Sequence, residues 1–148
     1  MNNPARPSLT YRERPIGIVT VVVAQLLIGF LHLFFGIWML TAQISPFEGI
    51  ITSTGGSDVY SIYTITFSLL TLIFAVPLWM QKRWGWIGTI AVALFVTIAD
   101  LLTLLDLPSV PGIPKFAGFG EITYSVIIVL YLLQGHVRDK YRIHQSGE

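Results

Sequence analysis

Four long apolar stretches, each with at most one acidic residue, dominate this chain of 148 residues. The hydrocarbon core of a bilayer is roughly 30 Å thick, so a helix needs about 20 apolar residues to cross it. The stretches that meet this length are residues 16–40, 60–80, 86–105 and 117–134. We therefore expect an all-α fold, an integral membrane bundle of four antiparallel helices.

The composition supports a membrane protein. Hydrophobic residues make up 53% of the chain and charged residues 11%, whereas soluble domains carry about 25% charged residues. The net charge is only +1 and there is no cysteine. These values exclude a disordered chain and a nucleic-acid binder, and they exclude zinc-thiolate and iron–sulfur sites.

The basic residues predict the orientation of the helices. Eight of the nine lysines and arginines lie before the first stretch, between the second and third, or after the fourth. Only Lys115 lies on the other side. Because cytoplasmic loops carry the excess of Lys and Arg, both termini are predicted to be cytoplasmic in a multi-pass protein of the cell membrane.

The chain divides into one domain with two short extensions. Residues 1–14 are predicted to be a mobile basic arm, residues 15–135 the four-span domain, and residues 136–148 a basic cytoplasmic tail. The first stretch is too long for the 7–15-residue apolar region of a signal peptide, so we expect it to be retained.

Small and polar residues recur at steps of three or four in two of the predicted helices. This spacing places them on one face of a helix, and small residues allow close packing between membrane helices. We expect these faces to point into the bundle. The candidate packing residues are Gln25, Gly29 and Gly36 in the first helix and Ala93 and Thr97 in the third.

Residues at the same depth in the bilayer predict an intramembrane polar cluster. With a rise of 1.5 Å per residue, His32 lies roughly 24 Å from Ile16, and Asp100 lies roughly 21 Å from Trp86. Both should therefore sit in the outer half of the bilayer. Residues of the second and fourth helices reach the same level, and the candidate cluster is His32, Asp100, Thr64, Ser68 and Tyr124.

Two interpretations of this cluster stay open. An ionisable residue inside a membrane is costly and often functional, so Asp100 and His32 could form a proton or cation site. Alternatively, Asp100 is protonated or hydrated near the interface, and His32 is an ordinary core residue. The outer acids Glu48, Asp58, Asp106 and Glu121 could likewise bind a divalent cation with Asp100, or could simply be solvated.

No recognised catalytic motif occurs in the sequence. A phosphate-binding glycine loop, an HExxH motif and a nucleophile elbow are all missing. We therefore predict no cofactor and no catalytic residues, and leave the metal content open.

The sequence favours a non-enzymatic accessory or scaffold subunit, partnered by the bilayer and by other membrane subunits or copies of itself. The alternatives are an ion- or proton-coupled transporter or channel using Asp100 and His32, and a membrane redox or lipid enzyme.

Three segments at predicted helix ends carry a resemblance. They are Arg14-Pro15 followed by Gln25 and Gly29, Leu78-Trp79 followed by residues 82–86 (KRWGW), and residues 131–133 (YLL) followed by residues 136–141 (HVRDKY). Together they resemble a broad, mainly archaeal group of small four-helix integral membrane proteins of unknown function. The resemblance implies the four-span topology and no catalytic residues. Asp100 and His32 are not part of it.

Overall fold

The computed structural model describes residues 16–42, 56–111, 113 and 115–142. Within these ranges the chain is helical and has no strands. The helices are α1 (Ile16–Ala42), α2 (Gly56–Trp79), α3 (Arg83–Leu104), α4 (Lys115–Leu133) and α5 (Gly135–Arg142). The first four are long and apolar enough to cross a membrane.

The structure confirms the all-helical fold with four long apolar helices. Helix α1 begins at the predicted residue, Ile16, whereas the next three begin earlier than predicted: α2 at Gly56 rather than Tyr60, α3 at Arg83 rather than Trp86, and α4 at Lys115 rather than Ala117. Polar residues at the ends of these helices account for the difference. Residues 1–14, Glu48 and the last six residues lie outside the described part of the chain.

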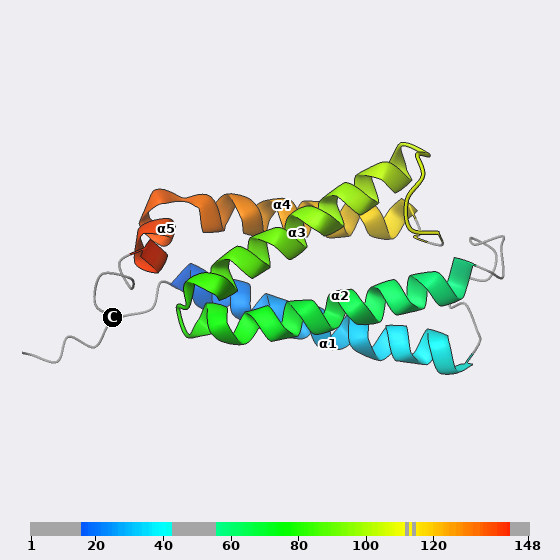
Figure 1. The fold of residues 1–148 in the computed structure, drawn as a ribbon, viewed down its shortest axis with the longest axis horizontal. Helices are drawn as coiled ribbons and strands as arrows, with labels where there is room; N and C mark the ends of the chain where they lie inside the picture. Colours follow the sequence, from blue (N-terminus) through cyan, green and yellow to red (C-terminus); the bar gives the residue numbers. More distant parts are fainter. Residues whose placement is uncertain (1–15, 43–55, 112, 114, 143–148) are drawn as a thin grey trace, which may run out of the picture.

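Successive long helices, from α1 to α4, run in opposite directions (Figure 1). Helix α1 packs along α2, α3 packs along α4, and α2 contacts α3. Helices α2 and α3 are close at the end where α5 lies and diverge toward the opposite end. The pair α1–α2 therefore contacts the pair α3–α4 mainly through α2 and α3.

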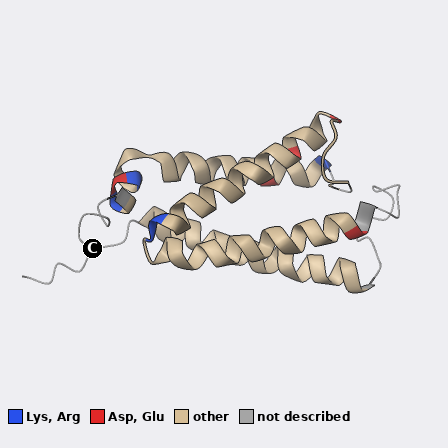
Figure 2. Cartoon of the chain, in the orientation of Figure 1, with Lys and Arg blue, Asp and Glu red and all other residues tan. Residues whose placement is uncertain are grey.

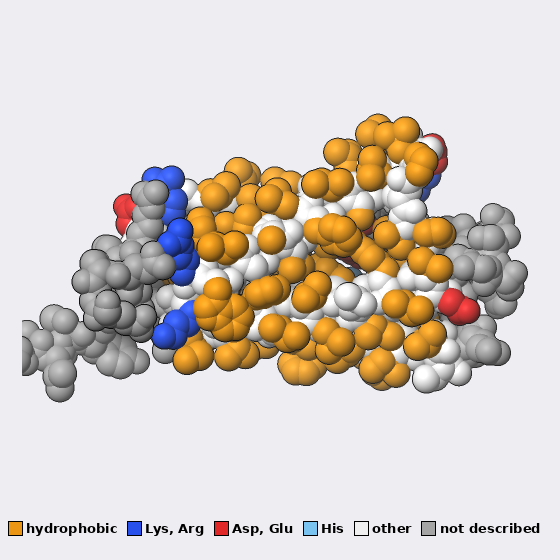
Figure 3. Space-filling view, viewed as in Figure 1, with side chains coloured by type: hydrophobic (Ala, Val, Ile, Leu, Met, Phe, Trp, Pro, Cys, Tyr) orange, Lys and Arg blue, Asp and Glu red, His pale blue; other side chains and the backbone are white. Residues whose placement is uncertain are grey.

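The charges mark the two ends of the bundle (Figure 2). We call the end that carries Lys82, Arg83, Arg138 and Lys140 the basic end. The opposite end, called the acidic end, carries Asp58 and Asp106, together with Lys115. Between the ends, large apolar side chains cover the surface that faces the viewer in Figure 3. Such a surface is suited to contact with lipid.

The same turn motif ends α2 and α3. Gln81, with a φ of 57°, follows α2, and Asp106, with a φ of 56°, follows α3. In the first turn the N–H of Lys82 donates to the carbonyl of Pro77, and the N–H of Gln81 donates to that of Leu78. This is the Schellman pattern, which supplies donors to the last carbonyls of a helix.

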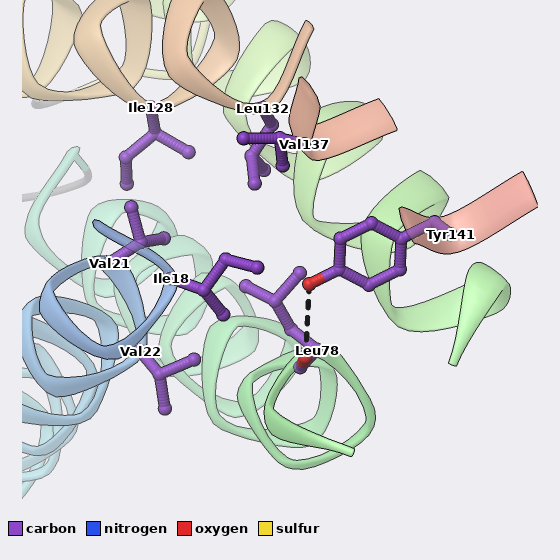
Figure 4. Close-up of a cluster of buried hydrophobic side chains, with 8 residues drawn as sticks. All are labelled: Ile18, Val21, Val22, Leu78, Ile128, Leu132, Val137 and Tyr141. Carbon is purple, nitrogen blue, oxygen red and sulfur yellow. Dashed lines mark hydrogen bonds between the residues drawn. The ribbon is translucent and has the colours of Figure 1, made fainter. Parts of the chain in front are cut away.

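Helix α5 packs against the basic end, although the sequence predicted only a basic tail there. Val137 and Tyr141 are buried in a cluster with Ile18, Leu78 and Leu132 (Figure 4). The Tyr141 hydroxyl donates to the carbonyl of Leu78 over 3.1 Å. Burial raises the pKa of the Tyr141 phenol, so the hydroxyl stays protonated at neutral pH.

Gly85 sets the close approach of α2 and α3 at the basic end. A Cβ atom there would overlap the backbone of Pro77 and Leu78. We predict that Gly85→Ala lowers the free energy of unfolding by about 2 kcal/mol, since backbone atoms cannot move aside as a side chain can. Unfolding of the purified protein in mixed micelles, followed by circular dichroism, measures the change.

Gly120→Ala is the matched control, because a Cβ atom on Gly120 has no neighbour within 4 Å. We expect this variant to be as stable as the natural chain or slightly more stable, since Ala is the better helix former. Equal destabilisation by the two substitutions would contradict the role given to Gly85.

Candidate functional site

His32 of α1 contacts an acidic side chain of α4. Its Nε2 lies 3.3 Å from Oε1 of Glu121, and its Nδ1 lies 2.9 Å from the carbonyl oxygen of Ile28. The ring also packs edge-on against Phe67 of α2, with the centroids 5.9 Å apart. Both members of the pair are largely buried, with 24% of the His32 side chain and 16% of the Glu121 side chain exposed.

The backbone contact fixes the state of the imidazole. A carbonyl oxygen only accepts hydrogen bonds, so Nδ1 of His32 must carry a hydrogen and donate to Ile28. The contact between Nε2 and Glu121 then requires one proton, which belongs either to the imidazole or to the carboxyl group. His32 and Glu121 are therefore a pair that holds one proton between them.

Asp100 of α3 is the most deeply buried acid in the described part of the chain. It is fully buried, and neither oxygen receives an N–H or O–H from a described residue. Among ionisable groups, Glu121 has the largest electrostatic influence on the Asp100 carboxyl group. His32 has a smaller influence. Two carboxyl groups can bond to each other only when one of them carries a proton.

Gly118 of α4 packs against Asp100 of α3. A Cβ atom on Gly118 would lie 3.5 Å from Cβ of Asp100 and 3.8 Å from its carboxyl carbon, which are ordinary van der Waals distances. The two helices are therefore in close contact where α3 carries the buried carboxyl group. We call His32, Asp100 and Glu121 the buried triad.

Two tyrosines of α2 lie within electrostatic reach of the buried triad. Tyr60 and Tyr63 both interact with Asp100 and Glu121. The hydroxyl of Tyr63 is buried and has no hydrogen-bond partner among the described residues.

The other predicted members of the polar cluster are placed differently from the triad. Ser68 donates to the carbonyl of Thr64 on the same helix, and both residues are buried. Tyr124 packs against the hydrophobic cluster at the basic end, and its buried hydroxyl has no partner in the described ranges. In the described structure, the Tyr124 hydroxyl therefore forms no hydrogen bond with the triad.

The predicted packing faces are used inside the single chain. Gly29 of α1 packs against Leu72 of α2, and Gly36 packs against Ile65. Gln25 reaches α3, where its Nε2 donates to Oγ1 of Thr89 over 3.3 Å. In α3, Ala93 is buried, and Thr97 is half-buried with its hydroxyl on the Ala93 carbonyl.

The predicted cluster omitted Glu121, which was grouped with the outer acids instead. The signal was present in the sequence. The buried residues of α4 are Gly118, Ser125, Ile128 and Leu132, and Glu121 falls at the step of three after Gly118 and the step of four before Ser125. It therefore lies on the inward face of the helix.

The outer acids do not gather around one ion in the described structure. Asp58 is exposed, and Asp106 pairs with Lys115 over 2.6 Å. Among the described residues, no three His, Asp or Glu side chains are arranged to hold a metal ion. The divalent-cation interpretation receives no geometric support from the residues that are described.

Comparison with protein-family models, with curated proteins and with solved structures finds no match for the chain. The resemblance to the archaeal group of small membrane proteins therefore stays a prediction.

The His32 tautomer gives a direct test of the site. In ¹⁵N spectra of the protein in bilayers, we expect Nδ1 of His32 to stay protonated across the pH range, with changes only at Nε2. The reason is the bond to the Ile28 carbonyl. A His32→Gln sample assigns the signals. The Glu121→Gln variant should also keep the hydrogen on Nδ1 of His32. A neutral imidazole with its hydrogen mainly on Nε2, in the natural protein or in Glu121→Gln, would contradict the geometry.

Proposed function

We propose that the protein is a small integral membrane protein that takes up and releases a proton at the buried triad, as part of proton movement through the membrane. The observation that carries this proposal is the fully buried Asp100 with no donor on either oxygen in the described structure. A buried carboxyl group whose main electrostatic partner is a second acid, Glu121, is costly inside a membrane, and a function in proton exchange explains its presence.

The triad can change its charge by one proton. Two protons shared among Asp100, Glu121 and Nε2 of His32 give a net charge of zero. Loss of one proton leaves a net charge of −1. Burial in a medium of low polarity makes such a change energetically large, so it can be coupled to a movement of the helices.

Access to the triad differs between the two ends of the bundle. The side chains of Glu121 and His32 are partly exposed, and Glu121 lies in the half of α4 that begins at the acidic end. At the basic end, the cluster built from Ile18, Leu78 and Tyr141 packs beneath α5. We propose that the proton enters from the acidic end and that passage to the basic end requires this cluster to open.

The accessory or scaffold role stays a prediction with reduced support. Its motives were the lack of a recognised reaction site, the small mass outside the membrane and the small-residue helix faces. The last of these is weakened, because Gly29 and Gly36 are occupied by Leu72 and Ile65 of the same chain. The glycine face is therefore not free to bind another subunit.

Proton flux into proteoliposomes tests the proposal. A pH-sensitive dye inside the vesicles reports acidification driven by an imposed membrane potential. We expect Asp100→Asn to reduce the flux to that of empty vesicles, because the amide has the same shape but cannot ionise. Asp106→Asn is the matched control, since Asp106 is exposed and paired with Lys115, and it should keep the natural rate.

Two results would overturn the proposal: a natural protein with no flux above empty vesicles, or an Asp100→Asn variant with undiminished flux. Unfolding curves of both variants show whether the fold is intact. An intact fold ensures that a loss of flux reports on the carboxyl group.

We further propose that the basic end faces the cytoplasm of the cell. The natural chain has no cysteine, so single cysteines can report on each side. We expect a membrane-impermeant maleimide to label Asp106→Cys in intact cells, and Lys82→Cys only after the membrane is opened. The reverse pattern would contradict this orientation.

A further inference from the structure

Basic side chains from two separate elements gather at the basic end of the bundle. The start of α3 contributes Lys82 and Arg83, and helix α5 contributes Arg138 and Lys140. We call these four residues the basic patch. Figure 3 shows the Lys and Arg side chains of this end in a row along the border of the apolar surface. Residues 80–86 and 133–141 contain a single acid, Asp139, so the patch carries a net positive charge.

An aromatic stack joins the two elements that carry the patch. The rings of Trp86 of α3 and Tyr141 of α5 are stacked, with their centroids 6.3 Å apart and an angle of 25° between their planes. Arg83 precedes Trp86 by three residues, and Arg138 precedes Tyr141 by three residues, which is about one helical turn in each case. The stack therefore brings basic residues of α3 and α5 close to one another.

Both elements hold their basic residues at fixed positions. In the turn, the N–H of Lys82 donates to the Pro77 carbonyl over 2.8 Å, and the carbonyl of Lys82 accepts from the N–H of Gly85. Helix α5 is held by the fully buried Val137. Lys82 and Arg138 are exposed, and within the described ranges neither forms an ion pair. The patch is thus a preorganised surface, which lowers the entropy cost of binding a partner.

Exposed apolar side chains border the basic patch. Met80 and Trp84 lie on either side of Lys82 and Arg83 in the chain, and each is 55% exposed. Tryptophan rings are enriched at the level of the lipid headgroups. A soluble anion would contact the basic residues alone, whereas a phospholipid carries a phosphate and an acyl chain in one molecule. The combination of charge and apolar surface therefore fits a lipid better than a soluble anion.

We propose that the basic patch binds the headgroup of an anionic phospholipid, whose acyl chains lie along the apolar surface beside Met80 and Trp84. Lys and Arg form charge-assisted hydrogen bonds with phosphate oxygens. An anionic lipid is favoured over a zwitterionic one, because a choline group would bring a positive charge to a surface that is already positive. This binding goes beyond the proposed proton exchange and does not require it.

Native mass spectrometry measures the binding with defined probes. The purified full-length protein in detergent is titrated separately with dioleoyl phosphatidylglycerol and with dioleoyl phosphatidylcholine, which have the same acyl chains. The dissociation constant of the first bound lipid is compared. We expect phosphatidylglycerol to bind roughly tenfold more tightly, since each nearby Lys or Arg contributes about fivefold in affinity for an anionic lipid.

Single substitutions test the two halves of the patch. Lys82→Gln and Arg138→Gln should each weaken phosphatidylglycerol binding about fivefold and leave phosphatidylcholine binding unchanged. Lys115→Gln is the matched control, because it removes a lysine at the acidic end, where Lys115 pairs with Asp106, and it should keep the natural affinity. Lys82→Arg retains the charge and should also bind normally, which separates loss of charge from loss of fold.

Four outcomes would contradict the proposal. The first is equal affinity of the natural protein for the two lipids. The second is an equal loss of affinity in Lys115→Gln. The third is a loss in only one of the variants Lys82→Gln and Arg138→Gln, because a shared site needs both elements. The fourth is displacement of the lipid by glycerol phosphate, which would assign the patch to a soluble anion. Proton flux is measured separately on Asp100→Asn, so failure of one proposal leaves the other tested.

Discussion

The absence of water in the bilayer governs this structure. A chain that crosses hydrocarbon must satisfy its backbone internally, which makes helices the solution here. Polar side chains must then find partners inside the bundle or remain costly. Gln25 donates to Thr89, and His32 contacts the Ile28 carbonyl and Glu121. Ser68 donates to the carbonyl of Thr64 on its own helix. Asp100 is the exception, since it is fully buried with no donor among the described residues.

The sequence predicted the parts of the fold that depend on length and periodicity. Hydropathy located the four long helices, and helical rise placed His32 and Asp100 at a common depth. Glu121 was missed because an acid near the end of a predicted span resembles a solvated loop residue. Helix α5 was missed because only Val137 and Tyr141, four residues apart, face the bundle from an otherwise polar segment. The position of Tyr124 depends on the packing angle of α4, which periodicity does not specify.

The two ends of the bundle differ in a way that suits vectorial proton movement. The basic end is packed with aliphatic side chains, and the Tyr141 hydroxyl bonds to the Leu78 carbonyl at the end of α2. On the side of the triad that faces the acidic end, no comparable aliphatic cluster is described, and the side chains of Glu121 and His32 are partly exposed. An asymmetric barrier of this kind is required of any carrier, because a site open to both sides at once would be a leak.

One close helix contact underlies both the divergence of α2 from α3 and the packing around Asp100. Gly85 brings α3 against the backbone of Pro77 and Leu78 at the basic end, and the two helices diverge from that point. Beyond that point α3 packs along α4, where Asp100 meets Gly118.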